Sequence, residues 1–514
     1  MTLIQTNRLL YDGTDWTFDT IRRIHDAVAE IAHKDLGLST YANQIEVITA
    51  EQMLDAYAST GMPQLYKHWS FGKHFAQHET GYRHGYMGLA YEIVINSDPC
   101  ISYIMEENSA TMQCLVIAHA AFGHNHFFKN NYLFQQWTDA EGILDYLTFA
   151  KRYIAECEER YGQAAVERVL DAAHALQAQG VHRYPRKKPL NLMSEELRER
   201  DRERQREEMF NDLWRTVPSK TAPSGKDLSE SRRRAMLDLP QENLLHFLEK
   251  SAPRLRPWQR EILRIVRLVA QYFYPQRQTK VMNEGCATYC HYQIMSRLHA
   301  NGQITDGSFL EFLQSHTNVV RQPTFESQHY NGINPYALGF DMMSDIERIV
   351  TEPSEEDREW FPDLAGTGDV MAVLRDTWAN YRDESFITQF MSPRLIRNWR
   401  LFHIADHPDE EDLKVAAIHN ERGYRALRRS LARQYDVAWT DPDIQVIDVD
   451  LAGDRKLIVH HNVLDGILLQ PGDCRSVLQH LADLWGYGVI LREVEEASGT
   501  VLAEHQASPR TGVA

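Results

Sequence analysis

Two stretches of the chain, His119-Ala-Ala-Phe-Gly-His124-Asn-His126 and Met282-Asn-Glu284-Gly-Cys-Ala-Thr-Tyr-Cys-His291, decide how the sequence is interpreted. Each combines metal-ligating side chains with a glycine in a helix-like, mostly apolar context. Imidazole and carboxylate groups bind divalent metals such as zinc, manganese or iron when three or four of them converge from separate elements. The two stretches therefore predict a metal site formed by His119, His124 and Glu284, with zinc as the first choice.

The spacing of the two histidines does not fit an ideal α-helix. His119 and His124 are at i, i+5, which places them about 140° apart around such a helix. They converge only if Gly123 unwinds or bulges the last turn, and glycine tolerates that distortion. Glu284 and His291 share one helical stripe but lie about 10 Å apart along its axis, too far to clasp one ion. We expect Glu284 to be the ligand.

The general base is not where a metallopeptidase usually has it. The order of the elements is that of glutamate zincins: a strand, then a helix with histidines, then a distant Glu-Gly helix. In those enzymes a glutamate directly follows the first histidine. Residue 120 is alanine here, so another group must activate water. Glu107 is the first candidate, and Glu106 and Glu92 are alternatives. His126 and His291 are held in reserve as further ligands or catalytic groups.

Other interpretations of these residues stay open. Histidines near glycine and aromatic residues often hydrogen-bond to the backbone in a polar core, and catalysis without a metal is a third possibility. Cys286 and Cys290 could chelate, but such residues are more often small buried side chains. Polar side chains that could bind a substrate amide, or in the case of asparagine cap a helix, are Asn130, Asn131, Tyr289 and Asn334.

Composition excludes several classes of protein. The 514 residues include 55 Lys and Arg against 72 Asp and Glu, a net charge of −17, which is the wrong sign for neutralising phosphates of a nucleic acid. With 43% hydrophobic residues the chain has ample core material.

No leader or apolar run of about 18 residues is visible, so we expect a soluble, cytoplasmic protein without membrane contact. Six scattered cysteines are expected to be reduced, and no phosphate-cradling, dinucleotide-binding or serine-hydrolase motif is present.

The expected fold is mainly α, in the α+β class. It has a zincin-like helical core with a short strand before the His-bearing helix, and a small C-terminal α+β unit. Residues 1–60 are expected to be helical, Gly88–Asn96 to form the strand, and a long helix to run from about Cys100 to Phe122. Four regions are expected: a helical one with the histidines (1–190), a charged linker or solvated helix (191–238), a second helical one with the Glu-Gly motif that packs on the first (239–400), and the C-terminal unit (401–514).

The C-terminal unit has the clearest strand pattern. Alternation around Ile444–Leu451 and a partner run Leu457–Val459 indicate a hairpin, followed by a helix over Arg475–Leu484 and a strand at Val489–Leu491.

Several blocks together resemble the stage V sporulation protein R family. They are Gly88–Asn96, the His119–Asn131 block, Gly180-Val-His-Arg-Tyr184, Trp258-Gln-Arg-Glu-Ile262, Gln271-Tyr-Phe-Tyr-Pro275, Val281-Met-Asn-Glu-Gly285 and Asn334-Pro-Tyr-Ala-Leu-Gly339. The resemblance implies a link to spore cortex peptidoglycan. In bacteria that make no spores it implies a stress-response role beside a serine protein kinase and a von Willebrand-type protein. In that family the positions of Cys286 and Cys290 usually hold tryptophan, which weakens the case for cysteine ligation.

Two hypotheses follow. The first is a metal-dependent hydrolase that acts on an amide or peptide bond of a wall precursor, in a cleft lined by Asn130, Asn131 and Tyr289. The second is a non-catalytic regulatory or scaffold protein that acts with the kinase and the von Willebrand-type partner, with structural histidines.

Overall fold

The computed structural model describes residues 9–59, 62, 65–83, 91–181, 239–324, 327–328, 330–401, 403–405, 414–416, 421–450 and 453–510. They form two compact units, each drawn from separate stretches of the chain. Unit 1 comprises Met1–Pro63, Ser70–Gln136 and Pro275–Thr440, and unit 2 comprises Gln64–Trp69, Trp137–Tyr274 and Asp441–Ala514. The expected linker 191–238 lies outside the described residues, and the domain boundaries expected from the sequence stay a prediction.

Unit 1 begins with a capped helix, α1 (Phe18–Glu30), whose apolar face of Ile21, Ile24 and Val28 is buried. Thr17 and Thr20 form a capping box that fixes its start. A π-helical turn, η1 (Ile31–Asp35), follows, and then β1 (Asn43–Ile48), α2 (Ala50–Ala58) and α3 (Trp69–Arg83). The expectation of helix throughout residues 1–60 is therefore wrong at β1.

A three-stranded sheet of unit 1 leads into the histidine-bearing segment. Its central strand is β3 (Cys100–Met105), with β1 parallel on one side and β2 (Glu92–Ile95) antiparallel on the other. The expected strand before the histidines is thus present at β2, but the long helix expected from Cys100 starts only at α4 (Ala110–Val116). Five of the six residues of β3 are buried, and local periodicity does not separate a strand buried on both faces from a buried helix.

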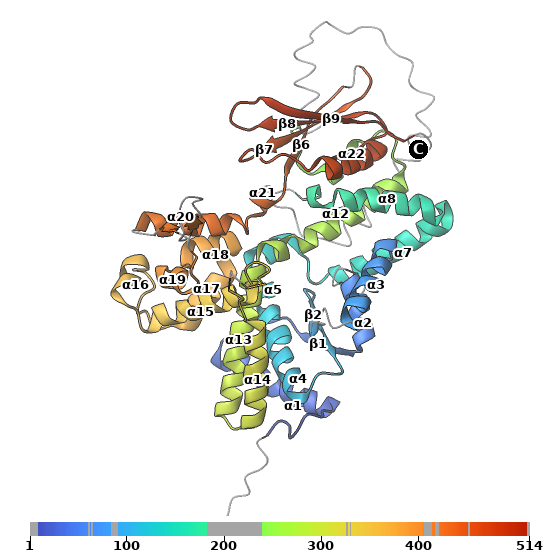
Figure 1. The fold of residues 1–514 in the computed structure, drawn as a ribbon. Coiled ribbons are helices and arrows are strands. Elements are labelled where there is room, and N and C mark those ends of the chain that lie inside the picture. The colour runs from blue at the N-terminus through green and yellow to red at the C-terminus, as the bar shows by residue number, and fades with distance from the viewer. Residues whose placement is uncertain are drawn as a thin grey trace, which may run out of the picture. The chain divides into compact units, whose positions relative to one another are not determined.

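Most helices of unit 1 (labelled in Figure 1) contribute side chains to a large apolar core, and α2 packs on the sheet in a smaller apolar cluster. After α4 the chain continues as η2 (Ile117–His124), α5 (Asn125–Asn130) and α6 (Tyr132–Trp137). The second part of the unit contributes α13 (Lys280–Ala300), α14 (Asp306–Val319), α15 (Pro335–Thr351), α16 (Glu355–Trp360), α17 (Val370–Asn380), α18 (Asp383–Phe390), α19 (Pro393–Asn398), β4 (His403–Ala405), β5 (Lys414–Ala416), α20 (Glu421–Arg433) and α21 (Val437–Thr440). Core side chains come from both parts, so segments about 160 residues apart in sequence pack together, as the metal-site hypothesis requires.

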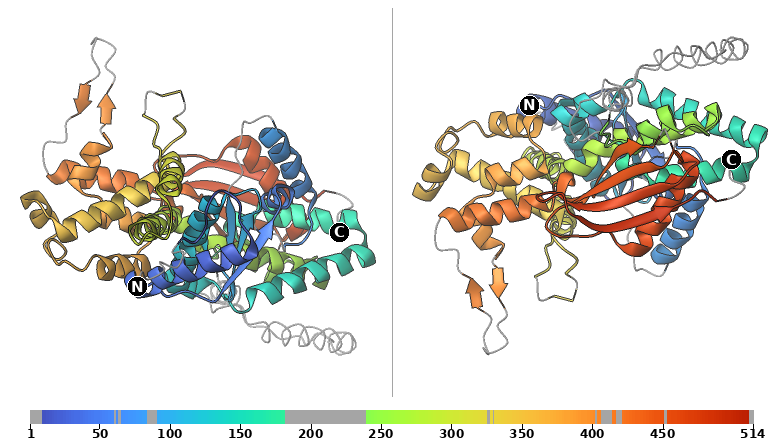
Figure 2. Two further views of the ribbon diagram at one scale, coloured as in Figure 1. Left: turned by 90° about the horizontal axis from the view of Figure 1, so that it is seen from below. Right: turned by 90° about the horizontal axis from the view of Figure 1, so that it is seen from above.

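Unit 2 combines helices with the C-terminal sheet. Its helical elements are α7 (Ile143–Tyr161), α8 (Gln163–Ala175), the short η3 (Gln177–Gln179), α11 (Leu244–Ser251) and most of α12 (Pro257–Gln278). The sheet, seen from above in the right-hand view of Figure 2, has the order β6-β7-β8-β9, formed by Asp443–Val449, Leu457–Val463, Val489–Glu495 and Val501–Ala507. Helix α22 (Pro471–Trp485) packs on it (Figure 1). The expected hairpin, helix and following strand are confirmed, whereas β9 was not expected.

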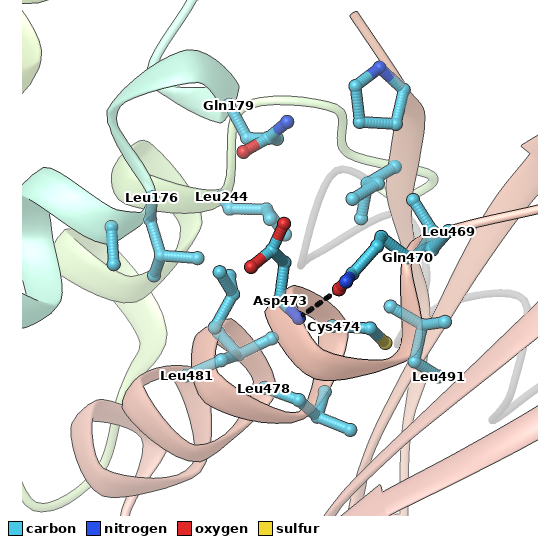
Figure 3. Close-up of a pocket in the computed structure, with 14 residues that line it drawn as sticks. Leu176, Gln179, Leu244, Leu469, Gln470, Asp473, Cys474, Leu478, Leu481 and Leu491 are labelled. Atoms are coloured by element: carbon cyan, nitrogen blue, oxygen red, sulfur yellow. Dashed lines mark hydrogen bonds between the residues drawn. The ribbon is translucent and has the colours of Figure 1, made fainter.

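A cavity of about 260 Å³ lies within unit 2 (Figure 3). Its walls are mostly aliphatic side chains from α8, α11, α22 and the sheet, with Gln179, Gln470 and Asp473 as polar members. It contains none of the residues that the sequence singled out as ligands or as substrate contacts.

None of the helices in the described part of the chain combines the length and the apolar character that a membrane crossing needs.

Candidate metal centre

The histidine-bearing segment η2 is a π-helix over Ile117–His124. In a π-helix the backbone hydrogen bonds connect residues i and i+5, so His119 and His124 face the same side, and their ring centroids lie 4.6 Å apart. Gly123 allows this winding against α13, because a Cβ on Gly123 would lie 2.5 Å from the Cα of Ala287. The distortion expected at the last turn is therefore present.

Helix α13 carries Glu284 toward the two histidines. The N-terminus of the helix is fixed by Asp383, whose carboxylate accepts hydrogen bonds of 2.8 Å each from the backbone N–H groups of Val281 and Met282. These bonds satisfy donors that have no partner within the helix. Glu284 follows Met282, the second of these anchored residues, by two positions, so its place in the first turns of α13 is fixed.

Three potential ligand atoms converge. One ring nitrogen of His119, one of His124 and a carboxylate oxygen of Glu284 all lie within 4.8 Å of one another. Glu284 Oε2 lies 3.8 Å from His119 Nε2 and 3.5 Å from His124 Nε2. Both histidines are buried, and the Glu284 side chain is 18% exposed. Within the described residues no other three His, Cys, Asp or Glu side chains meet this closely.

The tautomer of His124 is fixed by its neighbour Asn283. The Nδ1 atom of His124 lies 2.9 Å from the amide oxygen of Asn283. An amide oxygen only accepts hydrogen bonds, so Nδ1 donates and Nε2 carries the lone pair of the neutral ring. Burial lowers the pKa of His124 to about 4, although the charge of Glu284 works in the opposite direction. At neutral pH the Nε2 lone pair of His124 therefore faces the carboxylate of Glu284, whose Oε2 lies 3.5 Å away.

The two atoms that converge with His124 Nε2 are buried without a hydrogen-bond partner. His119 Nε2 and Glu284 Oε2 are both buried and form no hydrogen bond. Burial opposes ionisation of Glu284, but His124, His119 and the Tyr336 hydroxyl outweigh it, so the pKa of Glu284 falls below its usual range. Buried polar atoms without a partner are unfavourable, and a cation between them would satisfy all three. The residues present therefore fit a divalent metal.

Two further side chains border the cluster. Glu92 of β2 places Oε1 3.7 Å from His119 Nε2, and burial raises the pKa of Glu92, with Glu284 adding to the rise and His119 opposing it. The Tyr336 ring stacks on His119 with centroids 6.3 Å apart. Burial and the charge of Glu284 raise the pKa of Tyr336, so this phenol stays protonated.

Glu107, expected as the general base, lies elsewhere. Its side chain is exposed, and Oε1 accepts a hydrogen bond from the backbone N–H of Ala50, at the start of α2. Glu106 is exposed as well. Of the three acids considered, Glu92 is the one beside His119.

His126 and Asn130 belong to a backbone-bonded cluster around Ser39. His126 Nδ1 lies 3.0 Å from both the N and the O atom of Ser39, and its ring packs edge-on against Trp378. Burial lowers the pKa of His126 to about 4. Asn130 donates to the backbone oxygens of Ser39 and His126. The geometry gives these two residues a structural part and does not join them to the three ligand atoms.

The remaining expected substrate contacts also bond to protein groups. Asn131 is fully buried and donates to the backbone oxygens of Trp378 and Tyr381, at 2.7 and 2.9 Å. Tyr289 donates its hydroxyl hydrogen to Glu347 at 2.9 Å. Asn334 caps α15, where its side-chain oxygen accepts from the N–H of Tyr336. For Asn334 the helix-capping interpretation is therefore the one the structure bears out, and the cap positions Tyr336.

The cysteines and the second reserve histidine are buried. All six cysteines are free, and Cys286 and Cys290 lie in the core. His291 reaches the cluster through a hydrogen bond between ring nitrogens, since its Nδ1 lies 2.9 Å from Nδ1 of His119. On its other side, Nε2 lies 2.9 Å from Nδ1 of His316 in α14.

Three site residues were not singled out in the sequence. Asn283 directly precedes Glu284, and Tyr336 stands in the quoted Asn334–Gly339 block. Both therefore lie in motifs that the sequence identifies, but the sequence does not show which residues of each motif belong to the site. His316 lies in no motif, and only its aromatic surroundings on α14 hinted at burial.

Comparison with known proteins gives a consistent picture along the chain. The family model described as SpoVR like protein matches residues 15–440, and that of the SpoVR-like C-terminal domain matches residues 442–496. The protein named uncharacterized protein YcgB from Escherichia coli (strain K12) is 52% identical over 503 residues, covering 98% of this chain and 97% of that protein. No solved structure matches the chain.

Proposed function

We propose that this chain, which belongs to the SpoVR family, binds one divalent metal ion through His119, His124 and Glu284 and uses it to hydrolyse an amide or peptide bond. The observation that carries the proposal is the convergence of three ligand atoms within 4.8 Å, two of which are buried without a hydrogen-bond partner. Zinc suits a set of two imidazoles and one carboxylate.

The number of ligands favours catalysis over a structural role. Structural zinc sites are closed by four protein ligands, whereas catalytic sites use three and keep a position open. A divalent cation held at this centre would supply Lewis-acid chemistry for hydrolysis. The likeness to zincins consists of this ligand set and its order along the chain, and it is part of the proposal.

Two bordering residues receive roles in this scheme. Glu92 takes the place of the glutamate missing after His119 and acts as the general base, because its carboxylate lies within 3.7 Å of a ligand nitrogen and burial raises its pKa toward the range useful for proton transfer. The protonated hydroxyl of Tyr336 would donate a hydrogen bond to an oxygen on which negative charge develops.

The proposed substrate class is inferred from the name of the family. Because its name refers to sporulation, we infer that the bond cleaved is an amide or peptide bond of cell-wall peptidoglycan or its precursors, in cortex formation or in a stress response. The regulatory alternative, with a serine protein kinase and a von Willebrand-type protein as partners, predicts no bound metal.

Metal content tests the proposal. Elemental mass spectrometry would be applied to protein purified without chelator, for the wild type, His119→Ala, Glu284→Gln and the control His299→Ala. His299 is on the same helix as Glu284 but bonds to Asp306 and stacks on Phe309. We expect near-stoichiometric metal in the wild type and control and loss in the other two. No metal in folded wild type, even after reconstitution, would support the regulatory alternative.

A further inference from the structure

Three imidazole rings form a continuous chain that starts at the candidate metal centre. His119 Nδ1 lies 2.9 Å from His291 Nδ1, and His291 Nε2 lies 2.9 Å from His316 Nδ1. His119, His291 and His316 are only 3%, 1% and 5% exposed. We propose that His291 and His316 are positioning residues that set the tautomer of His119 and thereby its ability to bind a cation. This inference rests on the metal centre proposed above.

The contacts couple the three tautomers. A neutral imidazole has one N–H and one bare nitrogen, and a hydrogen bond between two ring nitrogens needs one hydrogen between them. Two neutral arrangements satisfy both contacts. In the first, His119 Nδ1 donates to His291 and His291 Nε2 donates to His316, so His119 Nε2 is bare. In the second, both bonds run the other way, and His119 Nε2 carries the hydrogen.

Only the first arrangement provides a ligand. It directs the Nε2 lone pair of His119 toward the space shared with His124 and Glu284, whereas the second directs an N–H toward Glu92 and Glu284, 3.7 and 3.8 Å away. Histidines that bind metals usually donate their other N–H to a group that fixes the tautomer. Here that group is a histidine, which itself needs His316 as its acceptor.

Burial and aromatic contacts surround the two rings beyond His119. Burial lowers the pKa of His291 and, to about 4, that of His316. The His316 ring packs against Phe340, Tyr292 and Phe312, with centroids 4.8, 5.1 and 5.7 Å away. Cation binding at His119 therefore selects one set of hydrogen positions and leaves the hydrogen of His316 on Nε2.

Zinc affinity provides the first test. Competition with a chromogenic chelator would give the Zn²⁺ dissociation constants of the wild type, His291→Leu, His316→Leu, His316→Gln and the control His299→Leu, each checked for folding by circular dichroism. We expect affinity to fall about 10–100-fold in the first two leucine variants. His316→Gln should recover most of it, because its amide oxygen accepts the N–H of His291, and the control should match the wild type.

Hydrogen positions provide the second test, which holds even if a leucine variant fails to fold. In wild-type protein labelled with ¹⁵N-histidine, saturating Zn²⁺ should place the hydrogen of His316 on Nε2 in the NMR spectrum. A hydrogen on Nδ1, or unchanged zinc affinity in folded leucine variants, would overturn this inference while leaving the metal centre intact. A wild type that takes up no zinc would overturn both.

Discussion

Gly285 of α13 and Gly339 of α15 meet backbone to backbone: a Cβ on Gly285 would lie 2.6 Å from the Cα of Gly339. Gly285 directly follows Glu284, and Gly339 lies three residues after Tyr336. The close approach of these two helices therefore determines the distance between a proposed ligand and the phenol beside it.

The variant Gly285→Ala should disturb stability and metal binding together. The added methyl group meets backbone atoms, which cannot move aside as a flexible side chain can, so α13 and α15 must separate. We expect the free energy of unfolding to fall by about 1–3 kcal/mol and metal content to fall with it. Urea denaturation and elemental analysis would measure both.

Gly72→Ala is the matched control for that substitution. Gly72 lies inside α3, and a Cβ there would meet no atom within 4 Å. Alanine should therefore leave stability unchanged or raise it by up to about 1 kcal/mol. Equal destabilisation by both substitutions would argue against close helix packing as the cause.

Glu92→Gln should separate metal binding from catalysis. Glutamine keeps the shape of the side chain but removes its ability to take a proton. We expect metal content near the wild-type value and a fall of about 10²–10⁴-fold in hydrolysis, measured as new amino groups released from peptidoglycan fragments. The paired variant Glu107→Gln tests the base that the sequence suggested. Loss of activity in that variant alone would contradict the assignment to Glu92.

The convergence of His119 and His124 is predictable from the sequence, because the helix distortion that permits it is encoded locally. If His119 and His124 bind one metal ion, their i, i+5 spacing excludes an ideal α-helix between them. Gly123 marks the place where the helix can change. The structure has the π-helix there. The spacing does not reveal the neighbour that requires a glycine at this position, Ala287 of α13, because that contact joins segments far apart in sequence.

The choice between Glu92 and Glu107 as the proposed base, and the strand β3, depend on contacts between distant segments that the sequence does not reveal. The sequence favours Glu107 as the general base and leaves Glu92 as an alternative. The pairing of β2 with β3 separates the two, since it brings Glu92 opposite Ile104 and onto the side of the histidines. The strand β3 itself was mistaken for helix, because its pairing with β1 involves residues more than 50 positions earlier. Local periodicity does not record such partners.

Asn131→Ala should act through stability. Removal of the amide leaves the buried carbonyl groups of Trp378 and Tyr381 without this donor, and we expect a loss of about 2–4 kcal/mol in the free energy of unfolding. The control Asn380→Ala removes an exposed amide that bonds within its own helix, and should change stability by no more than about 0.5 kcal/mol. A stable Asn131→Ala protein with weakened substrate binding would instead support the substrate role expected from the sequence.

His174 in unit 2 should make stability depend on pH. The ring bonds to the Tyr66 hydroxyl at 2.7 Å, and burial, with a smaller effect from His68, lowers its pKa to about 4. The unfolded chain, with a histidine pKa near 6.5, binds more protons below that value than the folded chain does. The stability linked to His174 is therefore fully present above about pH 6.5, and up to about 3 kcal/mol is lost as the pH falls toward 4.

Comparison of the wild type with His174→Gln isolates this contribution from those of the other buried histidines. The free energy of unfolding, measured by urea denaturation from pH 8 to pH 4, should decline less steeply in the variant, so that the difference between the two proteins shrinks as the pH falls. A difference that stays constant over this range would show that His174 titrates alike in the folded and unfolded chains.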